Sequence, residues 1–197
     1  LGGSGCGKST LMKQLIGLLP PSAGSVALFG RSITEPDGEA ALHEVQRRMG
    51  VMFQSGALFG SMNLLENVML PLEMFTDLPP EGREAVARVK LGLVGLGDAA
   101  QLMPAEISGG MARRAGIARA MALDPPLLLL DEPSQGLAPV IVKKVRDTLA
   151  ALRREDLSVV LVEQNLGFAL SLADRVVVME NGMVVDRLSA AESQRHP

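Results

Sequence analysis

The sequence predicts an α/β fold in which a mostly parallel sheet is covered by helices on both faces. Three observations support this prediction. Short apolar runs alternate along the chain with helical patterns. Hydrophobic residues make up 47% of the 197 residues and, because Trp and Tyr are absent, they are mainly aliphatic, as in strands buried on both faces. A glycine-rich loop near the start leads directly into a helical pattern.

The first quarter of the chain predicts two helices and two strands. Apolar residues spaced for one helical face predict a helix over residues 11–19. An apolar strand is expected over residues 25–29, followed by a turn at Gly30. A second helical pattern covers residues 39–47, and the apolar run at residues 50–53 predicts a buried strand.

The middle of the chain predicts an inserted helical subdomain. Amphipathic patterns near residues 64–70 and 81–93 predict two helices, and Ser108 is a suitable N-cap for a third that continues over residues 112–123. We therefore expect one domain over residues 1–197. Its predicted parts are a core subdomain of residues 1–54 and 124–197 and a helical subdomain of about residues 55–123.

The last third of the chain returns to alternating strands and helices. Four consecutive leucines at residues 127–130, after two prolines, predict a buried parallel strand. The later elements are a helix over about 140–153, a strand over 159–162, a helix near 166–172, a strand over 175–179 and a hairpin turn at Asn181-Gly182.

Composition excludes several classes of protein. There are 19 Lys and Arg against 22 Asp and Glu, so a net charge of −3 gives no basic field to attract nucleic acid. One cysteine excludes an internal disulfide, and His43 and His196 do not suit a zinc site. The longest uncharged stretch, residues 49–65, contains Gln, Asn and Ser and does not predict a membrane span. Because Leu1 leads straight into the glycine motif, we expect an N-terminally truncated sequence that lacks the strand before Gly2.

Residues 2–10, GGSGCGKST, match the phosphate-loop pattern G-x-x-x-x-G-K-[ST]. Glycines allow successive backbone N–H groups to face a phosphate chain, and the following helix adds the positive end of its dipole. Lys8 is predicted to reach the β- and γ-phosphates, and the Ser9 hydroxyl to coordinate Mg²⁺. The predicted binding residues are Gly2, Gly3, Ser4, Gly5, Cys6, Gly7, Lys8, Ser9 and Thr10.

Two acids, Asp131 and Glu132, end the leucine strand. The carboxyl edge of a parallel sheet is where doubly wound folds bind ligands, so both side chains are expected beside the phosphate loop. Asp131 is predicted to hold Mg²⁺ through its water shell. Glu132 is predicted to polarise the water that attacks the γ-phosphate.

A third motif, Ser108-Gly109-Gly110-Met111, opens another helix whose N-terminus suits an anion. The phosphate loop, this Ser-Gly-Gly motif and the Asp-Glu strand, in this order, resemble the ATPase subunits of ABC transporters. The resemblance covers essentially the whole chain. It includes Gln54, which follows an apolar strand at the position of the family's Q-loop.

The resemblance implies ATP and Mg²⁺ at a site shared by two chains that meet head to tail. Ser108, Gly109, Gly110 and Met111 of one chain would close over ATP bound at Lys8 and Ser9 of the other. Gln54 would contact Mg²⁺ or the attacking water. The partners implied are a second ATPase subunit and a transmembrane permease, at the cytoplasmic face of the bacterial inner membrane.

Two positions depart from the common pattern of this family. Met111 stands where the family's Ser-Gly-Gly motif most often ends in Gln. Gln164 stands where a switch histidine commonly follows a strand. An amide donates a hydrogen bond to a γ-phosphate but carries no charge, so a proton-transfer role is not available there. Gln164 remains a candidate catalytic residue.

The resemblance to particular transporters is divided along the chain. Residues 49–123, with FQSGALF at 53–59 and SGGMARR at 108–114, are similar to ATPases of bacterial Mla/MCE-type lipid transporters. Residues 131–139, DEPSQGLAP, and VEQN at 162–165 are similar to ATPases of branched-chain amino-acid importers. The lipid interpretation leads, with an MCE-type lipid-binding protein as a further partner, because the helical subdomain meets the membrane subunit. The alternatives are the amino-acid importer, a nucleotide-binding regulator that hardly hydrolyses ATP, and a soluble ABC switch. The acidic balance, the single ATPase cassette and the short insertion disfavour the soluble switch.

Overall fold

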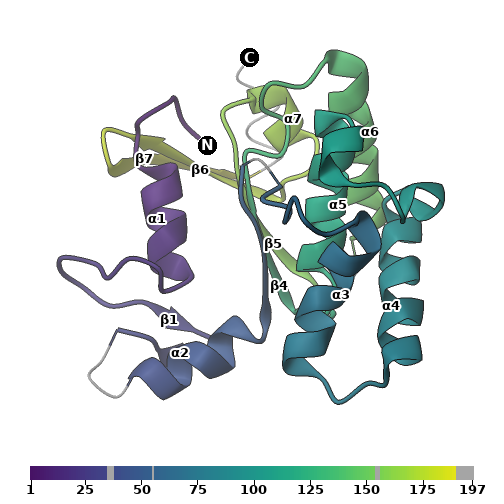
Figure 1. Cartoon of the computed structure of the whole chain (residues 1–197). Coiled ribbons are helices and arrows are strands. Elements are labelled where there is room, and N and C mark those ends of the chain that lie inside the picture. The colour runs from purple at the N-terminus through teal and green to yellow at the C-terminus, as the bar shows by residue number, and fades with distance from the viewer. Residues whose placement is uncertain (35–37, 55, 154–155, 190–197) are drawn as a thin grey trace.

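The computed structural model describes residues 1–34, 38–54, 56–153 and 156–189 (Figure 1). At its centre lies a parallel sheet of three strands in the order β3-β4-β5, which are Met49–Met52, Leu127–Asp131 and Ser158–Val162. Helices lie on both sides of this sheet (Figure 1). The α/β fold predicted from the sequence is confirmed. One of the two histidines considered in the sequence analysis, His196, lies outside the described residues.

The central strand β4 is buried along its whole length. Because successive side chains of a strand point to opposite faces, its four leucines divide between two hydrophobic clusters. Leu127 and Leu129 join the cluster beneath α1 and α2, and Leu128 and Leu130 join the cluster beneath the larger helical group. A strand with four consecutive leucines is stable only when both of its faces are covered.

The elements before β3 are α1 (Lys8–Leu15), β1 (Ala27–Leu28), β2 (Arg31–Ser32) and α2 (Gly38–Gln46). Two of the predicted elements, the first helix and the first strand, differ most from the structure. The helix expected over residues 11–19 ends earlier, because Gly17 takes a positive φ of 75° that breaks the helical path. The strand expected over 25–29 is a short antiparallel pair, because Phe29 and Gly30, with φ of 53° and 76°, reverse the chain.

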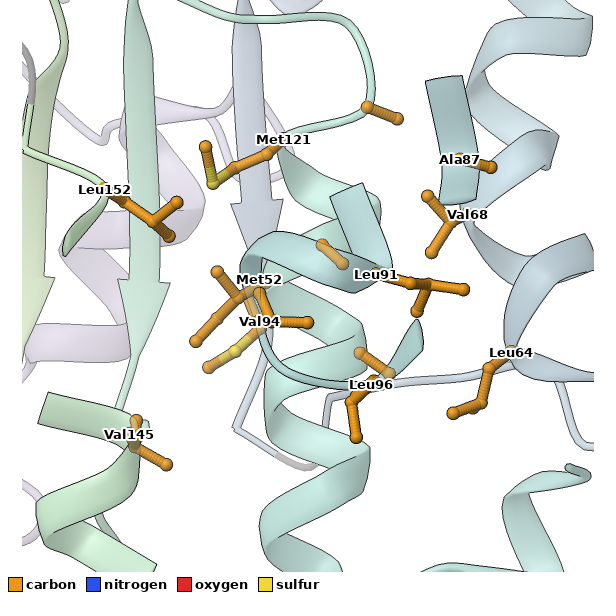
Figure 2. Close-up of a cluster of buried hydrophobic side chains, with 14 of the residues drawn as sticks. Met52, Leu64, Val68, Ala87, Leu91, Val94, Leu96, Met121, Val145 and Leu152 are labelled. Atoms are coloured by element: carbon orange, nitrogen blue, oxygen red, sulfur yellow. The ribbon is translucent and has the colours of Figure 1, made fainter. Parts of the chain in front are cut away.

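The helical group contains α3 (Leu64–Phe75), α4 (Pro80–Leu93) and α5 (Gly109–Ala120), with short 3-10 turns at Gly97–Ala99 and Pro104–Glu106. Asn63 and Glu66 form a reciprocal capping box that fixes the start of α3. Figure 2 shows the apolar core of this group, in which Leu64, Val68 and Leu91 are fully buried. None of the helices among the described residues is long and apolar enough to cross a bilayer.

The remaining elements are α6 (Pro139–Ala151), α7 (Leu166–Leu170), β6 (Arg175–Glu180) and β7 (Met183–Ser189). Strands β6 and β7 pair antiparallel through the predicted hairpin turn, where Asn181 and Gly182 both have positive φ. The start of the chain lies between the central sheet β3-β4-β5 and the pair β6-β7. The Met179 N–H donates to Leu1 O at 2.8 Å, and the Gly2 N–H donates to Glu163 O at 3.3 Å.

We predict that Gly50→Ala destabilises the protein by about 1–3 kcal/mol, the usual cost of overpacking a core. A Cβ on Gly50 would lie 2.1 Å from the Ala120 carbonyl oxygen, because β3 and α5 meet backbone to backbone. Gly92→Ala is the matched control, since nothing lies within 4 Å of its Cβ position and alanine favours the helix. Urea unfolding of both variants tests this; equal midpoints would contradict it.

Candidate active site

The phosphate loop runs from Gly2 into α1 and includes two glycines in the left-handed region, Gly5 at φ 78° and Gly7 at φ 96°. Lys8 is only 5% exposed, and its ammonium donates to the carbonyl oxygens of Gly2 and Gly3 at 2.7 and 2.8 Å. A positive charge is thus held under a loop whose backbone suits an anion.

The turn between β6 and β7 supports this loop from outside. The Gly182 N–H donates to Cys6 O at 3.0 Å, and a Cβ on Gly7 would lie 3.5 Å from the Gly182 Cα. The sequence predicted the hairpin turn at this position but not its contact with the loop. Because the contact joins residues more than 170 positions apart, no local pattern could reveal it.

Ser9 and Asp131 meet at the end of β4, where the Ser9 hydroxyl donates to Asp131 Oδ1 at 3.2 Å. Burial raises the pKa of Asp131 above its ordinary value; the Ser9 hydrogen bond lowers it, the Glu132 charge raises it, and Lys8 and Lys13 lower it. Hydroxyl and carboxylate oxygens are the ligands that Mg²⁺ prefers, so the pair fits this ion. Within the described ranges no group of three or more His, Cys, Asp or Glu side chains is arranged to hold a metal ion.

Glu132 brings together the other predicted catalytic residues. The residue is only 5% exposed. Its carboxylate accepts hydrogen bonds from Gln54 Nε2 at 3.2 Å and from Gln164 Nε2 at 2.7 Å. Lys8 Nζ lies 3.6 Å from the same carboxylate. The backbone of Glu132 has a φ of 47°, in the left-handed region that costs a non-glycine residue about 1–2 kcal/mol. Such strain is typical of functional positions.

Gln135, in the turn after β4, is a site residue that the sequence reasoning missed. Its side-chain oxygen accepts from Gln54 Nε2, and its carbonyl oxygen accepts from Arg113 Nη2 at 2.5 Å. Gln135 therefore links the Gln54 segment to α5. The buried residue Glu163 was also missed, although a charged residue directly after an apolar strand is the same signal that identified Asp131 and Glu132.

Ser108 caps α5 as predicted, because its hydroxyl accepts from the Met111 N–H at 3.3 Å. Gly110 is buried, and a Cβ there would lie 2.2 Å from a methyl group of Ile141. Across the described residues, no hydrogen bond or ion pair joins Ser108, Gly109, Gly110 or Met111 to the phosphate loop of the same chain. The chain therefore does not bring these two predicted parts of the site together by itself.

The loop after Gln54 packs directly on α5. A Cβ on Gly56 would lie 2.7 Å from the Ala112 carbonyl oxygen, and a Cβ on Gly116 would lie 3.0 Å from the Gly56 Cα. Arg119 Nη2 also donates to the Gly56 carbonyl oxygen at 3.1 Å. The contact is between two backbones, with no side chain between them.

The model of one protein family, described as ABC transporter, matches residues 1–135. The chain belongs to the ABC transporter family. Its fold is that of the family's ATP-binding cassette: one solved structure, the ATP-binding cassette MJ0796 in a dimeric post-hydrolysis state bound to ADP and Pi, superposes with a TM-score of 0.86. That protein is 30% identical to this chain, and the match covers 96% of this chain and 83% of MJ0796.

Two curated relatives are similar to this ABC chain over most of its length. The Escherichia coli K12 intermembrane phospholipid transport system ATP-binding protein MlaF is 39% identical, with 100% of this chain and 73% of MlaF covered. The Mycobacterium tuberculosis H37Rv protein mkl, named a probable ribonucleotide transport ATP-binding protein, is 42% identical, with 89% of this chain and 49% of mkl covered. The chain thus spans about half the length of mkl.

We predict that Asp131→Asn raises the melting temperature at pH 7 in the absence of nucleotide and Mg²⁺. Because the pKa of Asp131 is raised by folding, its ionised form costs stability at neutral pH, and this cost disappears as pH falls toward the unfolded-state pKa. The stability gap between the variant and the wild type should therefore narrow from pH 7 to pH 4.5. Thermal unfolding across this range measures it; a gap that widens on acidification would contradict the prediction.

Proposed function

We propose that the chain is the ATP-binding and ATP-hydrolysing subunit of a membrane transporter that moves phospholipids. The observation that carries this proposal is the 39% identity with MlaF, which extends over the whole of this chain, including the helical group α3 to α5. In this proposal that group is the helical subdomain of about residues 55–123, which meets the permease. An MCE-type lipid-binding protein is the further partner, and the subunit works at the cytoplasmic face of the inner membrane.

The phosphate loop would bind the triphosphate of ATP. Its backbone N–H groups and the N-terminus of α1 face the negative charge, and the buried ammonium of Lys8 would exchange its contacts with Gly2 and Gly3 for phosphate oxygens. Ser9 and Asp131 would hold Mg²⁺. The ion, when bound, supplies positive charge that neutralises the phosphate oxygens during phosphoryl transfer.

Glu132 would act as the general base that accepts a proton from the attacking water. Gln54 and Gln164 donate to its two different carboxylate oxygens, so they hold the carboxylate in one orientation. A lone pair of that carboxylate remains available to a water molecule. Because the amide of Gln164 does not take up or release a proton near neutral pH, its part in the reaction is to orient Glu132 and to donate a hydrogen bond to phosphate.

The proposed active form contains two chains. In one chain the N-terminus of α5, with Ser108 exposed at its start, has no bond to its own phosphate loop. The helix N-terminus is suited to the γ-phosphate held by a partner, and the related cassette MJ0796 is dimeric in its solved structure. The γ-phosphate would then join the two chains until hydrolysis removes it.

The similarity to mkl favours a second cargo, because the name of that relative specifies ribonucleotide transport. The branched-chain amino-acid interpretation rests on residues 131–139 and 162–165 alone. Cargo is chosen by the membrane and binding subunits, so the proposal must be tested with the assembled transporter. The full-length protein, co-expressed with its permease and binding subunits, is the material needed.

Native mass spectrometry of this complex should detect co-purified phospholipid. Reconstituted complexes should also move a fluorescent phospholipid between vesicles only when ATP and Mg²⁺ are present. A lipid-free complex that moves a ribonucleotide would favour the mkl-like cargo. A complex whose ATPase is stimulated by leucine and a binding protein would favour the amino-acid importer.

We predict that Glu132→Gln lowers ATP turnover about 10²-fold or more, the usual range for loss of a general base, while ATP binding is retained. Since the γ-phosphate then persists, this variant with ATP should become a dimer in light scattering. Adding Ser108→Arg, which places a bulky cation at the exposed start of α5, should keep the ATP-bound protein monomeric. Dimers that form equally well in this double variant would contradict a shared site.

A further inference from the structure

Glu163, the residue directly after β5, has a buried carboxylate with an unusual set of partners. It is 1% exposed, and its three side-chain hydrogen bonds with described residues all come from backbone N–H groups. Oε1 accepts from Ser134 at 2.9 Å, and Oε2 accepts from Gln164 at 3.1 Å and from Asn165 at 3.3 Å. Within the described part of the chain, no Lys, Arg or His nitrogen lies within 4.0 Å of this carboxylate.

Burying a charge that no cation contacts directly is costly, and hydrogen bonds from N–H groups offset part of that cost. The Arg113 guanidinium and the N-terminal ammonium attract this carboxylate only from beyond ion-pair distance. An apolar residue could end this strand without the cost, as Val162 does one position earlier. We therefore attribute to Glu163 the role of holding two segments in fixed relative positions. Its two oxygens fix the turn after β4 and the loop after β5 at one distance from each other.

Each side of this connection leads to a residue of the active site. On one side, Ser134 precedes Gln135, which binds the side chain of Gln54. On the other side, the N–H of Gln164 belongs to the residue whose side chain donates to Glu132 at 2.7 Å. The turn and the loop also line one open pocket of about 400 Å³, to which Ser134, Gln135, Glu163 and Gln164 contribute.

The main chain of Glu163 joins a third segment. Its carbonyl oxygen accepts from the Gly2 N–H at 3.3 Å, at the start of the phosphate loop. One residue thus connects the phosphate loop, the turn after β4 and the loop after β5. These three segments hold Lys8, Glu132 and Gln164, the groups that must keep fixed separations during hydrolysis.

We propose that Glu163 is a positioning residue for ATP hydrolysis, which holds Gln164 against the carboxylate of Glu132 by bonding the backbones on both sides of the site. The proposal rests on the ATPase activity proposed above and is independent of the cargo.

Glu163→Gln is the informative variant because it keeps the size of the side chain. An amide has one acceptor oxygen, and its NH₂ group would face the N–H groups that the lost oxygen bound, so either the turn or the loop loses its connection. Glu163→Asp is the second variant; it keeps the charge but is one methylene too short to reach both sides. Glu84→Gln, at an exposed ion pair with Arg88 on α4, is the matched control.

Steady-state ATP hydrolysis by the full-length protein with its permease tests the proposal. In Glu163→Gln and in Glu163→Asp, kcat should fall about tenfold or more while KM for ATP stays within about twofold, because phosphate contacts are unchanged. Glu84→Gln should retain wild-type kcat. A fluorescent ATP analogue should bind both Glu163 variants with nearly wild-type affinity, which establishes that they are folded.

A double-mutant cycle with Gln164→Ala separates positioning from general structural support. If Glu163 acts through Gln164, the double variant should be no slower than the slower single variant. Fold-losses that multiply, or a kcat within about twofold of wild type in both Glu163 variants, would overturn the proposal while the ATPase assignment stands. If the wild-type complex shows no ATP turnover that depends on Glu132, the ATPase assignment is overturned, and this inference with it. The Glu132→Gln variant measures that dependence.

Discussion

The site depends on one buried carboxylate, that of Glu132, which binds three groups from separate parts of the chain. Gln54, Gln164 and Lys8 reach it from the ends of β3 and β5 and from the phosphate loop. Parallel strands end at the same edge of a sheet, so the order β3-β4-β5 makes this convergence possible. Lys8 and the two amides offset the cost of burying the charge, while the neighbouring carboxylate of Asp131 adds to it.

Much of the fold could be predicted because its strongest signals are local. The leucine run of β4 is too apolar for a surface strand, and helices α3 and α4 show clear amphipathic patterns. The strand expected over residues 25–29 was wrong in length, since Phe29 takes a positive φ that its residue type does not signal.

The site was predictable where its chemistry lies in short motifs, and less so where it depends on distant contacts. The phosphate loop and the two acids after β4 stand out in the sequence. The partners that hold them do not, because Gln54 meets Gln135 across 81 positions and Ser134 meets Glu163 across 29. Contacts between residues so far apart in the sequence leave no local pattern from which they could be predicted. Only a charged residue at the end of an apolar strand hinted at Glu163.

The contact between Gly56 and Gly116 has a mechanical consequence. Side chains that separate two segments can change rotamer and absorb a small displacement, but two touching backbones cannot. A shift of α5 by a fraction of an ångström must therefore move the segment two residues from Gln54 by a similar amount, and Arg119 ties the same carbonyl to the helix. The helix that we propose faces a partner chain is therefore coupled almost rigidly to the segment of Gln54, whose amide donates to Glu132.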